Sequence, residues 1–69
     1  MEPFDLHGRP FVELCDLLKL TGNCPSGGAA KMAIAAGSVC VDGEVELRKR
    51  CKIRPGQVVS FAGRQIRVD

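Results

Sequence analysis

The sequence has no tryptophan and no tyrosine, and only three of its 69 residues are phenylalanine. Proteins that stack unpaired bases usually present exposed aromatic side chains for the purpose. We expect Phe4, Phe11 and Phe61 to lie in the core or at its edge. The scarcity of aromatic residues therefore argues against a platform on which a series of bases could stack.

Patterns typical of membrane and exported proteins are also missing. No apolar run approaches the roughly 20 residues that a transmembrane helix needs. The N-terminus, Met-Glu-Pro-Phe-Asp, has neither the basic nor the apolar region of a secretory signal. We expect a single domain, residues 1–69, that works in the cytoplasm without contact to a membrane.

Residues suited to catalysis are scarce as well. His7 is the only histidine, and no serine or cysteine lies close in sequence to a plausible base. Residues 26–31 contain two glycines and a lysine, but they lack the Gly-Lys-Ser/Thr ending of a phosphate-binding loop. We expect no enzymatic activity, no cofactor and no small-molecule substrate.

The four cysteines have no closely spaced pair. Cys15, Cys24, Cys40 and Cys51 are separated by 9, 16 and 11 positions. Zinc ligands usually include two that are close in sequence, and disulfides need an oxidising compartment. We expect four reduced thiols and no metal site.

Charge is distributed unevenly along the chain. Residues 1–47 carry a net charge of −4 and residues 48–69 carry +6, which together give the overall +2. A basic patch of this kind suits nucleic acid or an acidic protein surface. The alternative is a solvated face with no partner.

The central stretch, residues 39–54, alternates between apolar and charged side chains. Its two halves meet at Asp42-Gly43, which is a strong signal for a two-residue hairpin turn. If the stretch is extended, alternate side chains lie on opposite faces, and residues 48–54 span roughly 20 Å. The expected apolar edge is Val39, Val41, Val45, Leu47, Cys51 and Ile53, interrupted only by Gly43 and Lys49. The even positions carry the exposed cations Arg48, Arg50, Lys52 and Arg54, and with Lys49 these make five cations in seven residues.

Two helices are expected before this stretch. Residues 11–20 follow a helical apolar period, with Pro10 in the first turn and Gly22 as the stop. Residues 27–36 form the second helix, with Ser26 as N-cap and Gly37 at its end. Glycines at positions 27 and 28 disfavour a helix. Either the exposed backbone N–H groups there accept a phosphate, which Lys31 would also contact, or the helix start is too crowded for a larger residue.

The pattern of the C-terminal part predicts a second hairpin. A turn with Pro55 and Gly56 precedes strands at residues 58–61 and 65–68, and residues 4–7 form a weaker edge strand. The expected fold is α+β, with two helices packed on a small curled antiparallel sheet of three to five strands.

Several short motifs, in this order and spacing, resemble the S4-type RNA-binding domain. The resemblance is strongest to the small stand-alone bacterial S4-like proteins, and it covers the chain from about Val12 to Phe61. The motifs that carry it are Leu14 and Lys19-Leu20, Ser26 with Ala30-Lys31, Gly37, residues 39–43, residues 48–50 and residues 55–59.

The resemblance implies an αL motif, in which two helices and a hairpin form one RNA-facing surface. Family contacts from the start of the second helix and the hairpin correspond here to Ser26, Lys31 and the loop at Asp42-Gly43. This chain departs from the family at Glu13, where an arginine is usual, and at Gly27, where a basic residue often follows the cap. The basic residues 48–54 would replace those contacts.

We therefore predict a monomeric, non-catalytic protein that recognises structured RNA, such as ribosomal or transfer RNA, in translation or at the ribosome. The protein would recognise the phosphate backbone and the shape of the RNA. The predicted RNA-binding residues are Lys19, Ser26, Lys31, Arg48, Lys49, Arg50, Lys52 and Arg54. One alternative is a protein-interaction module whose basic face docks an acidic protein; another is a metal or redox sensor built on the four cysteines.

Overall fold

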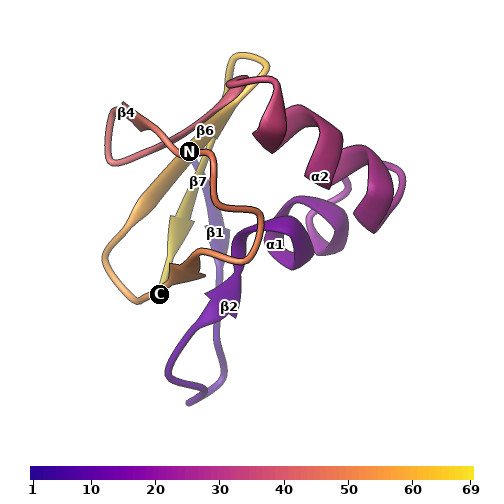
Figure 1. The fold of residues 1–69 in the computed structure, drawn as a ribbon. Helices are drawn as coiled ribbons and strands as arrows, with labels where there is room; N and C mark the ends of the chain where they lie inside the picture. Colours follow the sequence, from indigo (N-terminus) through magenta and orange to yellow (C-terminus); the bar gives the residue numbers. More distant parts are fainter.

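The computed structural model describes all 69 residues. Two helices pack against each other on one side of a five-stranded sheet, and a second sheet of two short strands lies beside the start of the first helix (Figure 1). The elements are β1 (Glu2–Phe4), β2 (Val12–Glu13), α1 (Leu14–Leu20), α2 (Gly27–Ala35), β3 (Val39–Val41), β4 (Glu44–Val45), β5 (Lys52–Ile53), β6 (Val58–Phe61) and β7 (Arg64–Val68).

The larger sheet has the strand order β1-β7-β6-β3-β4 and is mixed. Three of its four pairings are antiparallel, but β1 pairs with β7 in parallel. The α+β class is confirmed, and the expectation of a purely antiparallel sheet is corrected at this edge. Parallel neighbours need a long connection, and nearly the whole chain lies between β1 and β7.

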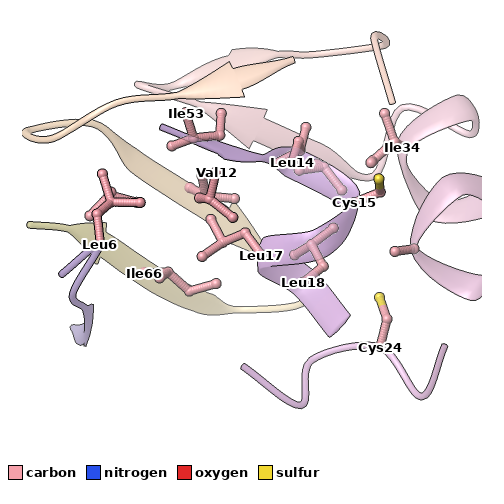
Figure 2. Packing of buried hydrophobic residues seen from close by; sticks show 14 residues of the cluster. Leu6, Val12, Leu14, Cys15, Leu17, Leu18, Cys24, Ile34, Ile53 and Ile66 are labelled. Carbon is pink, nitrogen blue, oxygen red and sulfur yellow. The ribbon is translucent and has the colours of Figure 1, made fainter. Parts of the chain in front are cut away.

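The core is apolar throughout and lies between α1, α2 and the sheets. No polar or charged residue is buried. Figure 2 shows Leu14, Leu17 and Leu18 of α1 at its centre. From α2, Ala30 and Ile34 are fully buried, and the small alanine lets the two helices approach closely. Burial of this kind supplies most of the stability of such a small domain.

Helix α1 is shorter than the sequence indicates, because it begins at Leu14 and not at residue 11. Residues 12 and 13 are extended and pair with β5. Phe11 therefore does not extend the apolar stripe of α1, and Pro10 precedes this strand and is not in a first helical turn. The C-terminal end agrees with the prediction, because Gly22 follows the cap with a φ of +76°.

Helix α2 begins and ends where the sequence predicts, to within one residue. The Oγ of Ser26 accepts a hydrogen bond from the Ala29 N–H at 3.1 Å, and Gly37 follows the helix with a φ of +80°. A Cβ at Gly27 would meet nothing within 4 Å. The idea that only glycine fits a crowded helix start is therefore wrong.

The β3–β4 hairpin is confirmed, but the alternation beyond it is not. Asp42 and Gly43 both have positive φ angles, as a type I′ turn requires. The strand ends at Val45, although the Glu46 N–H still donates a hydrogen bond to the Val39 carbonyl. Residues 46–51 form a loop in which the Glu46 carboxylate accepts a hydrogen bond from the Arg48 N–H. Of the expected apolar edge, Val39 and Ile53 are buried, Val41 and Cys51 are half-buried, and Val45 and Leu47 are 58% and 60% exposed.

The C-terminal hairpin closely matches the prediction. Strands β6 and β7 pair antiparallel around a turn at Ala62 and Gly63, and β7 begins one residue earlier than predicted. The pattern predicts a buried face of Val59, Phe61, Ile66 and Val68; all but Phe61 are buried, and Phe61 is half-buried. The weak edge strand is also present, but it covers Glu2–Phe4 and not residues 4–7.

Candidate nucleic-acid interface

Residues 48–54, called here the basic segment, are fixed to the core by their main chain. Helix α1 has no side-chain N-cap. Instead, the carbonyls of Cys51 and Lys49 accept hydrogen bonds from the N–H groups of Leu14 (2.9 Å) and Cys15 (3.1 Å). These contacts satisfy N–H groups that a helix start leaves without a partner. The cations are thus displayed from a backbone that the first helix holds in place.

Four of the predicted cations gather around one shallow depression, called here the basic hollow. Its lining residues are Arg48, Arg50, Cys51, Lys52 and Arg54. All four cations are exposed, and so is Lys49 in the same segment. The extended row that the sequence predicts is therefore a loop and a short strand that curve around a common concave surface.

Arg48 is paired with an acid that the sequence analysis did not include in the site. The carboxylate of Glu46 accepts bonds from Nη2 (2.9 Å), Nε (3.0 Å) and the backbone N–H (2.9 Å) of Arg48. The hydrogen bonds from Arg48 lower the pKa of Glu46 from 4.5 to about 2. The available signal in the sequence is a carboxylate two positions before an arginine, at Glu46 and Arg48.

Glu13 pairs with a second cation. Its Oε1 lies 3.5 Å from the Nε of Arg50. The resemblance marks this position as a lost RNA contact, and the structure shows an acid that faces the basic segment. Lys49, Lys52 and Arg54 have no ion-pair partner. These three residues carry the uncompensated charge of the segment.

Phe11 lies next to two of the unpaired cations. The Nζ of Lys52 is 5.0 Å from the centre of the Phe11 ring, and the Cζ of Arg54 is 5.9 Å from it. Phe11 is only half-buried and does not pack against the core cluster, whereas Phe4 and Phe61 do. The expectation that all three phenylalanines lie in the core or at its edge is therefore not met by Phe11, which does not pack against the core cluster.

The remaining predicted residues lie elsewhere, on the helices. Ser26 caps α2, Lys31 is exposed within α2, and Lys19 is exposed near the end of α1. In Figure 1 the start of α2 is at the far end of the helical layer from the loop between β4 and β5. The fold therefore gathers residues 48–54 at one place and does not add Ser26 to them.

Two other depressions differ from the basic hollow because acidic side chains contribute to their lining. A groove beside the β3–β4 hairpin combines Asp42, Glu44 and Glu46 with cations of the basic segment. Another depression lies among residues of β1, β6 and β7 and contains one acid and one cation, Glu2 and Arg64. The basic hollow is the one that has no acidic lining residue.

The cysteines do not form a cluster. All four are free, and Cys15 and Cys24 belong to the core. Burial raises the pKa of the thiols of Cys24 and Cys51, which disfavours the reactive thiolate. No group of three or more metal-binding side chains is present, and none of the helices has the length and apolar character to cross a membrane.

We expect Glu46 to titrate far below an ordinary glutamate. In the folded protein its pKa should be about 2, and substitution Arg48→Met should return it toward 4.5, because the lowering comes mainly from hydrogen bonds to Arg48. A lowered pKa contributes stability that is present above pH 4.5 and is lost as the pH falls toward 2. Carbon NMR of the side-chain carboxylates would measure both values. A wild-type Glu46 that titrates near 4.5 would show that this ion pair does not form in solution.

Comparisons with known proteins agree on one family. A family model described as "S4 domain" matches residues 4–69. The chain is 62% identical to "Putative RNA-binding protein YbcJ" of Escherichia coli over 99% of its own length and 97% of that protein, and it matches YbcJ of Shigella flexneri to the same extent.

Solved structures show the same fold. The solution structure of Escherichia coli YbcJ, described as revealing an αL motif involved in RNA binding, has a TM-score of 0.75, 62% identity and coverage of 99% of this chain and 86% of that one. The 30S ribosomal protein S4e of Thermoplasma acidophilum has a TM-score of 0.62 at 24% identity, and the match covers 83% of this chain and 30% of that one. The second likeness concerns the fold alone.

Proposed function

The chain belongs to the S4 domain family, and from this premise we propose that it is a non-catalytic RNA-binding protein whose contact surface is centred on the basic hollow. The observation that carries the proposal is the convergence of Arg48, Arg50, Lys52 and Arg54 on one concave surface without an acid in its lining. The relative with 62% identity bears a name that refers to RNA binding. A rigid cluster of cations fits the phosphate backbone of a nucleic acid.

Binding would depend mainly on contacts between the cationic side chains and RNA phosphates. Arginine can hold a phosphate through two parallel N–H bonds, whereas lysine acts as a mobile point charge. Arg48 and Arg50 are already held by Glu46 and Glu13. Their guanidinium groups are thus oriented before RNA arrives, while Lys49, Lys52 and Arg54 supply the net positive charge.

The proposed ligand is structured RNA of the ribosomal or transfer type, recognised by a monomer of this single domain in the cytoplasm. The hollow follows the curve of a short loop and strand, and this shape suits a folded backbone in which several phosphates lie close together. Lys19, Ser26 and Lys31 would form a second, peripheral contact along the helices. The open N-terminus of α2, where Gly27 leaves free space, is compatible with such a contact.

A titration against ribosomal and transfer RNA at several salt concentrations tests the proposal. If about four to six phosphates are neutralised, the logarithm of the affinity should fall with the logarithm of the salt concentration with a slope of about −3 to −5. Filter binding or fluorescence anisotropy would measure it. An affinity that is independent of salt, or no binding by the folded protein, would refute this function.

The competing function is a docking module for an acidic protein. The observation that favours it is the exposure of Val45 and Leu47, by 58% and 60%, directly before Arg48. Apolar side chains beside a basic patch are usual at protein interfaces. If this competing function is the correct one, an acidic protein will bind to the chain, and an excess of ribosomal RNA will fail to displace that protein.

A further inference from the structure

The two short strands β2 and β5 form a ribbon with one buried and one exposed face. Val12 is paired with Ile53, and both are buried. Side chains alternate along a strand, so the neighbours on either side face the other way. Those neighbours are Phe11, Glu13, Lys52 and Arg54.

An aromatic ring on this outer face needs an explanation. Phe11 is half-buried but does not contribute to the core cluster. The two cations near its ring, Lys52 and Arg54, also line the basic hollow. The ring therefore lies at the rim of the proposed phosphate-binding surface.

We propose that Phe11, Lys52 and Arg54 form a binding site for one unpaired nucleotide of an RNA, whose base stacks on the Phe11 ring while the adjoining phosphate contacts the two cations. This inference rests on the proposed RNA-binding function and specifies one subsite of it. Every base has a π-face, so the site selects an unpaired nucleotide and not a particular sequence.

Lys52 would change partner when the nucleotide binds. A stacked base contributes more than an exposed ammonium above a ring, and the ammonium lies on a flexible stem that can turn toward the phosphate. Glu13, the one acid on this face, is paired with Arg50. Its charge is thus partly neutralised before a phosphate approaches.

The single ring of Phe11 would favour RNAs that contain one unpaired nucleotide, and it would not make the protein a binder of long single strands. The low aromatic content excludes a series of stacked bases, but a single ring beside a phosphate-binding hollow suits a bulge or a loop next to a helix. Such an RNA presents closely spaced phosphates and one base that is free to leave the stack.

The test compares two RNAs that differ by one nucleotide. One is a fully paired duplex without a loop, and the other is the same duplex with a single bulged 2-aminopurine, whose fluorescence reports stacking. Wild type is compared with Phe11→Leu, which removes the ring, and with Phe11→Tyr, which retains it. Phe4→Leu is the matched control, because it makes the same change at a phenylalanine that packs against the core.

The inference predicts that Phe11→Leu weakens binding of the bulged RNA by roughly 5- to 50-fold and changes binding of the paired RNA by less than about twofold. Phe11→Tyr and Phe4→Leu should keep the wild-type preference for the bulged RNA. Wild type, but not Phe11→Leu, should change the 2-aminopurine fluorescence.

Equal effects of Phe11→Leu on the two RNAs, or no effect on either, would overturn the nucleotide site while leaving the proposed function intact. Failure of the wild type to bind either RNA would refute the proposed function, and the nucleotide site with it. Circular dichroism of each variant verifies that Phe11→Leu is folded, as expected for a side chain outside the core cluster.

Discussion

Replacing Lys49, Lys52 and Arg54 together with alanine should lower the affinity for structured RNA by about 10²- to 10³-fold near 0.1 M salt. These three cations are the members of the basic segment without an ion-pair partner. Each phosphate contact contributes about tenfold under these conditions, because affinity varies with nearly the inverse first power of salt for each contact. The slope of the salt dependence should become shallower by about 2 to 3.

The matched control removes three cations from outside the predicted site. Arg9, Arg64 and Arg67 are exposed, and substitution of all three with alanine changes the net charge by the same amount. A general effect of net charge would weaken both triple variants equally. If the two variants lose the same affinity while both remain folded, the basic segment is not the RNA contact and only the overall charge of the domain matters.

Ile53→Ala should destabilise the domain by about 2 to 5 kcal/mol, whereas Leu47→Ala should change its stability by less than about 0.5 kcal/mol. The sequence places both side chains on the same apolar edge. In the structure Ile53 is fully buried between β2 and the core, and Leu47 is 60% exposed. A domain of this length has a total stability of only about 3 to 10 kcal/mol, so Ile53→Ala should be marginally folded.

Urea unfolding followed by circular dichroism would measure both free energies of unfolding. The difference between the two substitutions is the informative quantity, because each removes a similar amount of apolar side chain. If Leu47→Ala were as damaging as Ile53→Ala, residues 46–51 would continue the alternation as a strand, and the loop that surrounds the basic hollow would not exist.

Ile53 also connects stability with function. Its neighbours Lys52 and Arg54 point away from the core, toward Phe11 and the basic hollow. The pairing of Ile53 with Val12 holds them in this position. One buried residue therefore orients cations on either side of it, and its loss should weaken RNA binding as well as folding.

The elements that were predictable from the sequence are those whose signals are local. Ser26 caps the second helix through its own hydroxyl, and Gly37 ends it because glycine tolerates a positive φ. The turn at Asp42-Gly43 depends on the same backbone property. These interactions involve residues within a few positions of each other, so their pattern can be read without a fold.

The start of the first helix could not be predicted in this way. Phe11 fits the helical apolar period as well as Leu14 does, and nothing local distinguishes them. The helix begins at Leu14 because residues 12 and 13 pair with a strand 40 residues later in the chain, and because carbonyls of Lys49 and Cys51 cap the first turn. Partners so distant in sequence leave no periodic signal.

The same distinction between local signals and long-range contacts applies to the candidate site. The sequence by itself determined the resemblance to the family, through the order and spacing of short motifs, and its local pattern indicated the α+β class and the cluster of cations at residues 48–54. Only the tertiary structure decided that the cluster is a curved surface, that Glu46 and Glu13 hold two of its arginines, and that Phe11 lies outside the core beside it. Which side chains meet across a fold depends on the pairing of remote strands, and a shift of one residue in that pairing exchanges the inner and outer faces.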